Sequence, residues 1–268
     1  MPATMAKSVG EPDAIRDACM RNSLSGKVAL ITGASTGIGL ASAHELAAEG
    51  VRLFITGRRG PEIADAARAI GRGTVGVQAD VSNLADLDRL YDQISRDAGR
   101  LDVVFANAGG GDMLPLEAIT AEHVDRIFGT NVKGLLFTVQ KALPLMKEGG
   151  SVILTGSTAG RKGTASFSVY SAAKAAVRSL ARSWVLELAS RRIRVNVVSP
   201  GPIATPGLAA LVPADHKGAL FQQLASAVPM GRLGDAAEVA NAVAFLASED
   251  ASFINGAELF VDGGVAQV

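Results

Sequence analysis

The chain has 268 residues, and its 26 Lys and Arg residues balance 26 Asp and Glu residues, so the formal net charge is zero. A chain without net charge has no long-range field to attract nucleic acid or an anionic membrane surface, which disfavours both as partners. The length predicts one domain, and no apolar run approaches the roughly 18 residues that a membrane-spanning helix needs.

The first 23 residues, Met1–Ser23, carry three acidic side chains and lack the apolar core of a secretory signal. We expect a mobile leader there, with a short helix over Asp13–Met20 as the alternative. The single cysteine of the chain, Cys19, lies in this leader. One cysteine cannot form an intramolecular disulfide and suits a reducing compartment, so we expect a cytoplasmic protein.

A glycine turn comes next along the chain. Lys27–Thr32 is an apolar run typical of a strand, Gly33–Gly39 follows directly, and Leu40–Glu49 has helical character. Glycines let the backbone approach a pyrophosphate, and the start of the next helix offers free N–H groups. The spacing is G-x-x-x-G-x-G, which differs from the common G-x-G-x-x-G, and no Gly-Lys-Ser/Thr of a nucleoside-triphosphate loop follows. The glycines alone predict either a dinucleotide cradle or an ordinary strand-to-helix turn.

Six further strand-like runs alternate with stretches long enough for crossover helices. This alternation predicts an α/β fold, a single-domain, doubly wound parallel sheet of Rossmann-like type with helices on both faces, over residues 24–268. Ligands of such sheets bind at the carboxyl ends of the strands, so the loops after these runs should form the site. The runs are Val51–Thr56, Thr74–Gln78, Leu101–Ala106, Ser151–Thr155, Ile193–Val198 and Glu258–Val261.

A proline-rich stretch, Pro202–Arg232, interrupts this alternation and is more apolar than a solvated loop should be. We predict a substrate lid there, containing a short helix over Ala214–Ala227. Met113, Leu114 and Phe167 are expected to shape the pocket together with this lid.

Tyr170 and Lys174 are four residues apart in an Ala-rich stretch that predicts a helix, so the phenol and the ammonium share one face. A fixed positive charge favours the phenolate and lowers a tyrosine pKa from its usual value of about 10. That pairing is a route to acid/base chemistry. Taken alone it is a weak signal, because a half-buried ring beside a solvated lysine is common.

The motifs together resemble the short-chain dehydrogenase/reductase family over about Leu24 to Val268. Thr32-Gly-Ala-Ser-Thr-Gly-Ile-Gly39 is similar to the cofactor motif T-G-x-x-x-G-I-G, and Asn107-Ala-Gly109 is similar to the N-A-G motif. The family often has a further Asn before N-A-G, where this chain has Ala106. Asp80-Val81, Pro200-Gly-Pro-Ile-Ala-Thr205 and Val261-Asp-Gly-Gly264 also match family segments in order.

The resemblance implies an NAD(P)-dependent oxidoreductase that interconverts a carbonyl group and a secondary alcohol. Its catalytic residues would be Tyr170 as general acid/base, Ser157 at the substrate oxygen, Lys174 beside Tyr170 and the nicotinamide ribose, and Asn131 holding a relay water. The sequence pattern places Asn131 in the middle of a helix. The cofactor-binding residues that it implies are Gly33, Ser35, Thr36, Gly37, Ile38, Gly39, Arg58, Asp80, Val81, Asn107, Ala108, Gly109, Tyr170, Lys174, Pro200, Gly201, Ile203 and Thr205.

The end of the second predicted strand favours NADP over NAD. An acid at that place bonds the ribose 2′-hydroxyl and repels a 2′-phosphate, whereas an arginine attracts the phosphate. This chain has Gly57-Arg58-Arg59 there and no acid. Thr36 stands where many NADP-dependent relatives have a second basic residue, so NAD stays the alternative.

The substrate is not determined by the sequence. A 3-oxoacyl-thioester reductase and a glucose-type sugar dehydrogenase are alternatives within the family, and Arg161-Lys162 could meet an anionic substrate. Two other classes fit less well. A cofactor-sensing module would not need Tyr170 and Lys174, and a sugar-nucleotide epimerase or dehydratase has its glycines spaced G-x-x-G-x-x-G.

The expected partners are a small-molecule carbonyl or alcohol substrate and other copies of the chain. The three histidines share no metal-ligand spacing, so no catalytic metal is expected. Apolar residues go most of the way around the predicted helix Val169–Ala189, too far for a helix with one buried stripe. The family resemblance suggests a homotetramer, in which this helix packs on its own copy and Asp235–Val268 makes the second contact.

Overall fold

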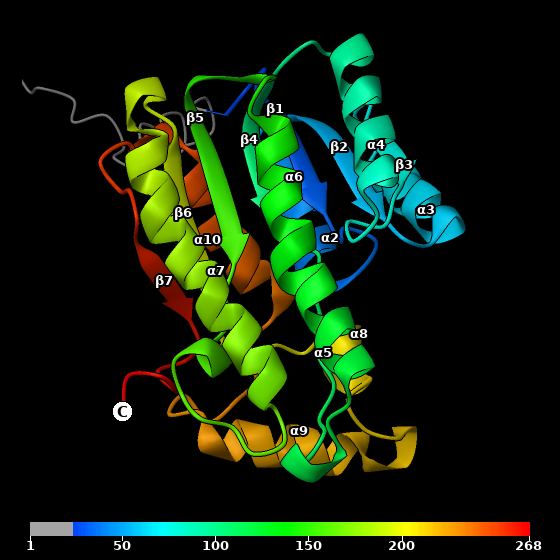
Figure 1. Ribbon diagram of the computed structural model, residues 1–268, viewed down its shortest axis with the longest axis vertical. Coiled ribbons are helices and arrows are strands. Elements are labelled where there is room, and N and C mark those ends of the chain that lie inside the picture. Colours follow the sequence, from blue (N-terminus) through cyan, green and yellow to red (C-terminus); the bar gives the residue numbers. More distant parts are fainter. Residues whose placement is uncertain (1–23) are drawn as a thin grey trace, which may run out of the picture.

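The structure is a computed structural model that describes residues 24–268 (Figure 1). The leader, its alternative short helix and Cys19 lie outside the described residues. Within them, no helix combines the length and the apolar character needed to cross a membrane.

A parallel sheet of seven strands is the centre of the described fold, in the order β3-β2-β1-β4-β5-β6-β7. The order reverses between β1 and β4, which places a ligand crevice at their carboxyl ends. The predicted fold class is therefore confirmed. The strands are β1 (Val28–Thr32), β2 (Arg52–Gly57), β3 (Val75–Gln78), β4 (Leu101–Ala106), β5 (Met146–Thr155), β6 (Arg194–Pro200) and β7 (Glu258–Val261).

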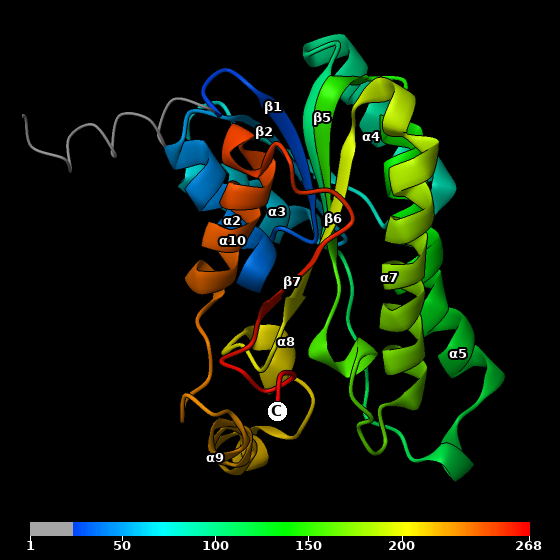
Figure 2. The same cartoon turned by 90° about the vertical axis from the view of Figure 1, so that its left-hand side faces the viewer.

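Helices cover both faces of the sheet (Figure 2). One apolar core lies under α2 (Gly37–Ala48), α3 (Gly60–Ile70) and α10 (Ala236–Ala247), with side chains such as Leu46 and Val243 fully buried. The other lies under α4 (Leu84–Asp97), α6 (Leu135–Ala142) and α7 (Ser168–Glu187), with Leu90 and Val177 buried. Because both faces are covered, β1 and β6 are buried along their whole length.

Two strands are longer than their apolar runs predict. β5 begins at Met146, five residues before the predicted Ser151, and its register against β4 shifts between Leu101 and Val103. The added residues Lys147, Glu148 and Gly149 are exposed, and Gly149 has a φ of +80°. An irregularity of this kind carries polar and glycine residues, so the apolar pattern does not reveal it. β6 likewise continues beyond Val198 to Pro200, at the edge where β7 pairs with it.

The predicted lid stretch lies beyond the carboxyl ends of the strands, at the bottom of Figure 1. It contains α8 (Pro206–Ala209), a 3-10 turn (Ala214–His216) and α9 (Lys217–Ala227). The predicted helix Ala214–Ala227 thus corresponds to the turn and α9 together. No residue of α9 is buried.

Candidate active site

The glycine turn between β1 and α2 packs backbone to backbone against the loop after β4. Gly33 has a φ of +66°, and a Cβ there would lie 2.8 Å from Ala108 Cα. A Cβ at Gly39 would lie 2.3 Å from the carbonyl oxygen of Gly33. Side chains cannot occupy either space, so the turn is fixed close to the sheet with the N-terminus of α2 directed outward. Thr36, the residue that precedes α2, is exposed, and its side chain caps none of the free N–H groups.

Asn107 ties the ends of three strands together. Its Nδ2 donates to the carbonyl oxygens of Thr32 at 2.9 Å and Gly33 at 3.2 Å, and its Oδ1 accepts from Thr155 Oγ1 at 3.3 Å. The N–H groups of Asn107 and Ala108 both donate to Thr32 Oγ1, at 3.0 and 2.9 Å. In the structure the predicted N-A-G motif thus acts as a brace between β1, β4 and β5.

Tyr170 and Lys174 lie on consecutive turns of α7, next to Ser157. The Lys174 side chain is only 3 % exposed, and its Nζ donates to the carbonyl oxygen of Thr155 at 2.8 Å. The same Nζ lies 5.5 Å from the centre of the Tyr170 ring. Ser157 caps a 3-10 turn (Thr158–Gly160), and its Oγ accepts from the Ala159 N–H at 3.1 Å. The same hydroxyl is hydrogen-bonded to the Tyr170 side chain.

Burial dominates the acid/base character of both groups. It raises the pKa of Tyr170 above its usual value of 10.0, against a smaller lowering by the hydrogen bond to Ser157. It also lowers the pKa of Lys174 to about 8. The direction for Tyr170 is opposite to the one expected from a neighbouring ammonium, because desolvation of the phenolate is the largest influence on its pKa. The phenol therefore holds its proton at neutral pH.

Asn131 lies inside a π-helical segment (Gly129–Gly134) between α5 (Ala121–Phe128) and α6. Its Nδ2 donates to the carbonyl oxygens of Ile127 at 2.9 Å and Gly110 at 2.8 Å, and its Oδ1 accepts from the Gly110 N–H at 3.3 Å. A Cβ at Gly109 would lie 2.6 Å from Asn131 Oδ1 and 3.3 Å from Lys174 Nζ. The structure thus brings Asn131, Gly109 and Lys174 together, with the Asn131 amide bonded to the loop after β4.

The other predicted cofactor residues of the first half of the fold lie around the ends of β2 and β3. A Cβ at Gly57 would lie 3.5 Å from Ser35 Oγ, so the end of β2 faces the glycine turn. Arg58 is exposed there, and its carbonyl oxygen accepts from Gln78 Nε2 at 3.0 Å. Ile38 is half-buried against the core.

The segment after β3 holds the next predicted pair. Asp80 Oδ1 accepts from the N–H and the hydroxyl of Ser82, at 2.9 and 2.7 Å. Val81 is buried, and a Cβ at Gly134 would lie 2.8 Å from it. Gly134 therefore lets the helix that carries Asn131 approach this segment closely.

The segment after β6 meets the glycine turn from the other side. A Cβ at Gly37 would lie 3.3 Å from Thr205 Cγ2, and one at Gly201 would lie 2.7 Å from Asp262 Cα. Ile203 is buried and forms a β-bridge with Gly234. Pro200 is buried at the end of β6. The predicted cofactor residues thus line one continuous edge of the sheet.

The chain is similar to several known proteins. The family model described as enoyl-(acyl carrier protein) reductase matches residues 33–266. The oxidoreductase asL5 of Sarocladium schorii is 48% identical over 251 residues, covering 91% of this chain and 98% of the relative. The chain belongs to the short-chain dehydrogenase/reductase family. It is also similar to the hydroxynaphthalene reductase-like protein Arp2 of Metarhizium brunneum, with 33% identity over 255 residues, 90% of this chain and 96% of the relative. The crystal structure of levodione reductase matches with a TM-score of 0.87 and 32% identity, covering 91% of this chain and 99% of that one.

Short-chain dehydrogenases/reductases generally use NAD or NADP. The glycine turn of this chain fits such a group, since Gly33 and Gly39 leave no room for a Cβ and keep the start of α2 accessible. Arg58 and Ser35 lie at the edge where the ribose of a dinucleotide belongs in this fold. Among residues 24–268 no group of three or more His, Cys, Asp or Glu side chains could hold a metal ion.

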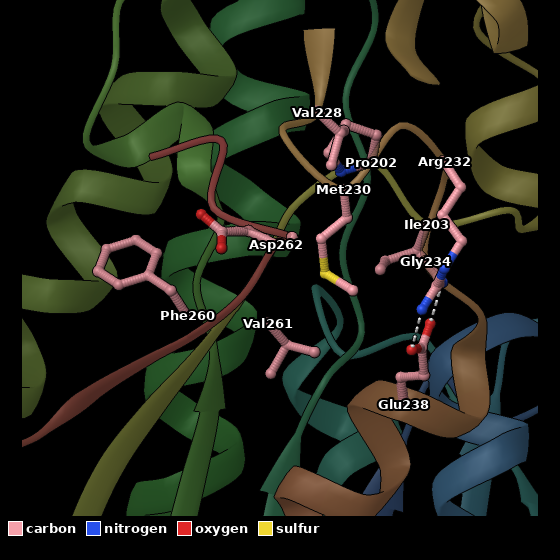
Figure 3. A pocket seen from close by; sticks show the side chains of 11 residues that line it. Pro202, Ile203, Val228, Met230, Arg232, Gly234, Glu238, Phe260, Val261 and Asp262 are labelled. Carbon is pink, nitrogen blue, oxygen red and sulfur yellow. Dashed lines mark hydrogen bonds and ion pairs between the residues drawn. The ribbon is translucent and has the colours of Figure 1, made fainter. Parts of the chain in front are cut away.

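A cavity of about 230 Å³ is lined in part by Pro202 and Ile203 (Figure 3). Val228, Met230 and Phe260 supply much of its apolar lining, and the Arg232–Glu238 ion pair lies at its edge. None of the four predicted catalytic side chains of this dehydrogenase/reductase lines it. The cavity and the predicted catalytic residues are therefore separate features of the structure.

Three residues that contact the site were missed as site residues by the sequence reasoning. The Thr32 hydroxyl accepts from the Asn107 N–H, and the Thr155 carbonyl oxygen accepts from Lys174 Nζ. Gly111 packs on the Tyr170 ring. Thr32 and Thr155 end apolar strand runs, and this position at the carboxyl end was a usable signal. Gly111 belongs to the run Gly109-Gly-Gly111, in which the sequence does not tell which glycine is constrained.

Proposed function

We propose that this protein reduces the carbonyl group of a ring ketone, with NADPH as hydride donor and Tyr170 as proton donor. One observation carries the proposal. The Tyr170 phenol is bonded to Ser157, one helical turn from the buried ammonium of Lys174, at the edge of the sheet that holds the glycine turn.

The chemistry follows from these groups. When bound, the nicotinamide supplies a hydride to the carbonyl carbon. The carbonyl oxygen takes the electron pair of the broken π bond and needs a proton at that moment. Tyr170 donates this proton, since burial keeps its phenol protonated. The Ser157 hydroxyl hydrogen-bonds the same oxygen as charge develops on it, and the Lys174 ammonium stabilises the phenolate that Tyr170 becomes.

A ring ketone is favoured by the surroundings of Tyr170 and by the relatives. Phe167 lies beside Tyr170 with ring centres 4.5 Å apart and planes inclined by 30°, and Phe167 is half-buried. Its ring can contact the apolar body of a flat substrate. Two similar proteins are named for hydroxynaphthalene and for levodione, which supports the same class.

A 3-oxoacyl thioester is the second candidate, because the matching family model is described by an acyl carrier protein. An anionic carrier calls for basic side chains near the entrance. Lys162 follows the catalytic serine, but its Nζ donates to the carbonyl oxygens of Val265 at 2.6 Å and Val268 at 3.1 Å. Of the predicted basic pair, Lys162 is thus bonded within the chain, which leaves Arg161 to meet an anionic carrier. A single arginine is little basic surface for such a carrier, so the ring ketone is favoured.

The test is turnover of a panel of ring ketones, 3-oxoacyl thioesters and glucose with the parent and with Tyr170→Phe. Removing a general acid costs about 10²- to 10⁴-fold, so ketone reduction by Tyr170→Phe should fall by that factor. Cofactor affinity, measured by fluorescence titration, should stay nearly the same, since the phenol acts on the substrate oxygen.

The matched control is Tyr91→Phe, which removes the hydroxyl of a buried tyrosine that donates to the Thr138 carbonyl oxygen of α6. This variant should keep its turnover. Activity of Tyr170→Phe within about tenfold of the parent would remove Tyr170 from the mechanism.

The preference for NADPH rests on Arg58. Arg58 is exposed at the end of β2, and its neighbours Gly57 and Ser35, the latter in the glycine turn, are uncharged. A charge-assisted bond to a 2′-phosphate of about 1.5–3 kcal/mol corresponds to a preference of roughly 10- to 150-fold. Arg58→Ala should lose most of this preference, and Gly57→Asp should reverse it by repelling the phosphate.

Titration of NADPH and NADH into the parent and both variants measures the ratio. Arg52→Ala is the control, because Arg52 is an exposed arginine at the opposite end of the same strand, over the Phe54 ring. Equal binding of both cofactors by the parent, or the same ratio in all variants, would show that the end of β2 does not select the cofactor.

A further inference from the structure

Gly111 makes a close contact with the Tyr170 ring that no other residue type can make. A Cβ at Gly111 would lie 2.6 Å from Tyr170 Cδ2, 2.8 Å from Tyr170 Cγ and 3.0 Å from Phe167 Cε2. At the neighbouring Gly110, a Cβ would meet nothing within 4 Å. Neither glycine needs a positive φ. The constraint on Gly111 is therefore one of space at the ring, and it is absent one residue earlier.

The loop around Gly111 is held on three sides. The Asn131 amide bonds both the N–H and the carbonyl oxygen of Gly110. The Leu114 N–H donates to the Ser166 carbonyl oxygen at 2.6 Å, which joins this loop to the segment just before α7. Asp112 forms an ion pair with Arg126 of α5. A side chain at position 111 would thus displace the rings more readily than the loop.

We propose that Gly111 is a positioning residue for Tyr170. Its bare Cα is the surface on which the ring edge rests, and Phe167 closes the stack at a centroid distance of 4.5 Å. Together they fix the direction in which the phenol points from the first turn of α7. This inference rests on the proposed function, because the phenol is the group assigned to proton donation.

The first readout needs no substrate. The chain contains two tyrosines, so a protein labelled with ¹³C-tyrosine gives one set of ring signals for Tyr170 and one for Tyr91. Tyr170→Phe assigns them. Gly111→Ala should move the Tyr170 signals and leave those of Tyr91 in place, whereas Gly110→Ala should move neither.

The second readout is turnover. A displacement of a reacting group by about 1 Å costs on the order of 10²-fold, so kcat of Gly111→Ala should fall by about 10- to 100-fold while cofactor affinity stays unchanged. Gly163→Ala is the activity control, since Gly163 lies on the loop after Ser157 and a Cβ there meets nothing within 4 Å. A purely structural role would instead lower the melting temperature and leave kcat of the folded fraction intact.

If Gly111→Ala does not fold, the same change is made in a Phe167→Ala background, where the contact to the second ring is gone. The Tyr170 signals should still move relative to Phe167→Ala, because the shortest contact is to Tyr170 itself. Tyr170 signals and kcat that match those of the glycine controls would overturn the inference. Absence of ketone turnover in the parent would instead refute the proposed function, and the ring signals would still decide the role of Gly111.

Discussion

Lys174 is a buried lysine whose surroundings disfavour its positive charge. Its side chain is 3 % exposed, and its ammonium donates to one neutral carbonyl oxygen, that of Thr155. Removal from water disfavours the charged form, and this desolvation lowers the pKa of Lys174 to about 8. The proposed mechanism needs the charged ammonium of Lys174. With a pKa of about 8, this charge is lost within a pH range that is easily reached in an assay.

We therefore expect kcat/KM for ketone reduction to fall as the pH rises through about 8. The sign follows from the lowered pKa of a base, which is charged below that pH and neutral above it. Above the pKa the loss should approach about tenfold per pH unit, as for one titrating proton. The pKa of Tyr170 is raised, so its phenol stays protonated over the same range and causes no further fall in kcat/KM there.

The measurement is a pH profile of kcat/KM, which reports groups of the free enzyme. Lys174→Ala should have a low rate and no limb near pH 8. A parent profile that is flat across this range would show that the ammonium is not required. A limb that persists in Lys174→Ala would belong to another group.

At the scale of single residues, the sequence predicts spacing better than contacts. The spacing of Tyr170 and Lys174 predicts a shared helix face, and the structure places the Lys174 Nζ 5.5 Å from the centre of the Tyr170 ring. The predicted direction of the Tyr170 pKa shift was wrong. Desolvation raises this pKa, and desolvation depends on how deeply α7 is packed, which the spacing does not reveal. The role of Gly111 was not predicted for a similar reason, since its constraint comes from the Tyr170 ring, 59 residues later in the chain.

At the scale of elements, every strand of the described sheet overlaps a predicted run, because buried parallel strands are continuous apolar stretches. The π-helical segment around Asn131 is different. The sequence predicts a helix through Asn131, and the widened turn depends on tertiary contacts, among them the bonds from Asn131 to Gly110 and the approach of Gly134 to Val81. Such turns occur mostly at functional sites, which fits the convergence of Asn131 on Lys174.

The predicted lid stretch, Pro202–Arg232, packs differently from the rest of the fold. α9 contains apolar residues such as Leu220, Phe221 and Leu224, yet none of its residues is buried. Both ends of the lid are fixed. Thr205 caps α8 through the Leu208 N–H at 3.2 Å, and Gly234 exchanges backbone bonds with Pro202 and Ala204 at 3.0 and 2.9 Å. We propose that this apolar helix, with anchored ends and no buried side chain, closes over the substrate.

At the scale of the whole molecule, α7 has more apolar surface than this chain covers. Its buried side chains, Ala173, Lys174, Val177 and Ala181, form one stripe against the sheet. On its other faces Trp184 is half-buried and Leu186 is 78% exposed. A helix with apolar residues on most of its faces needs a second partner surface. We infer that α7 of another copy supplies it, in a two-fold interface within a tetramer.

Light scattering at micromolar concentration tests this assembly. The parent should have a mass several times that of the 27.4 kDa chain, and Leu186→Glu should shift it toward smaller species by placing a charge in the interface. Leu116→Glu is the control, because Leu116 is an equally exposed leucine, at 80%, that belongs to a 3-10 turn (Leu116–Ala118) and not to α7. Both changes are at exposed positions, so the folded chain should tolerate them. A parent mass near 27.4 kDa would refute the interface, and an equal effect of the two substitutions would place it elsewhere.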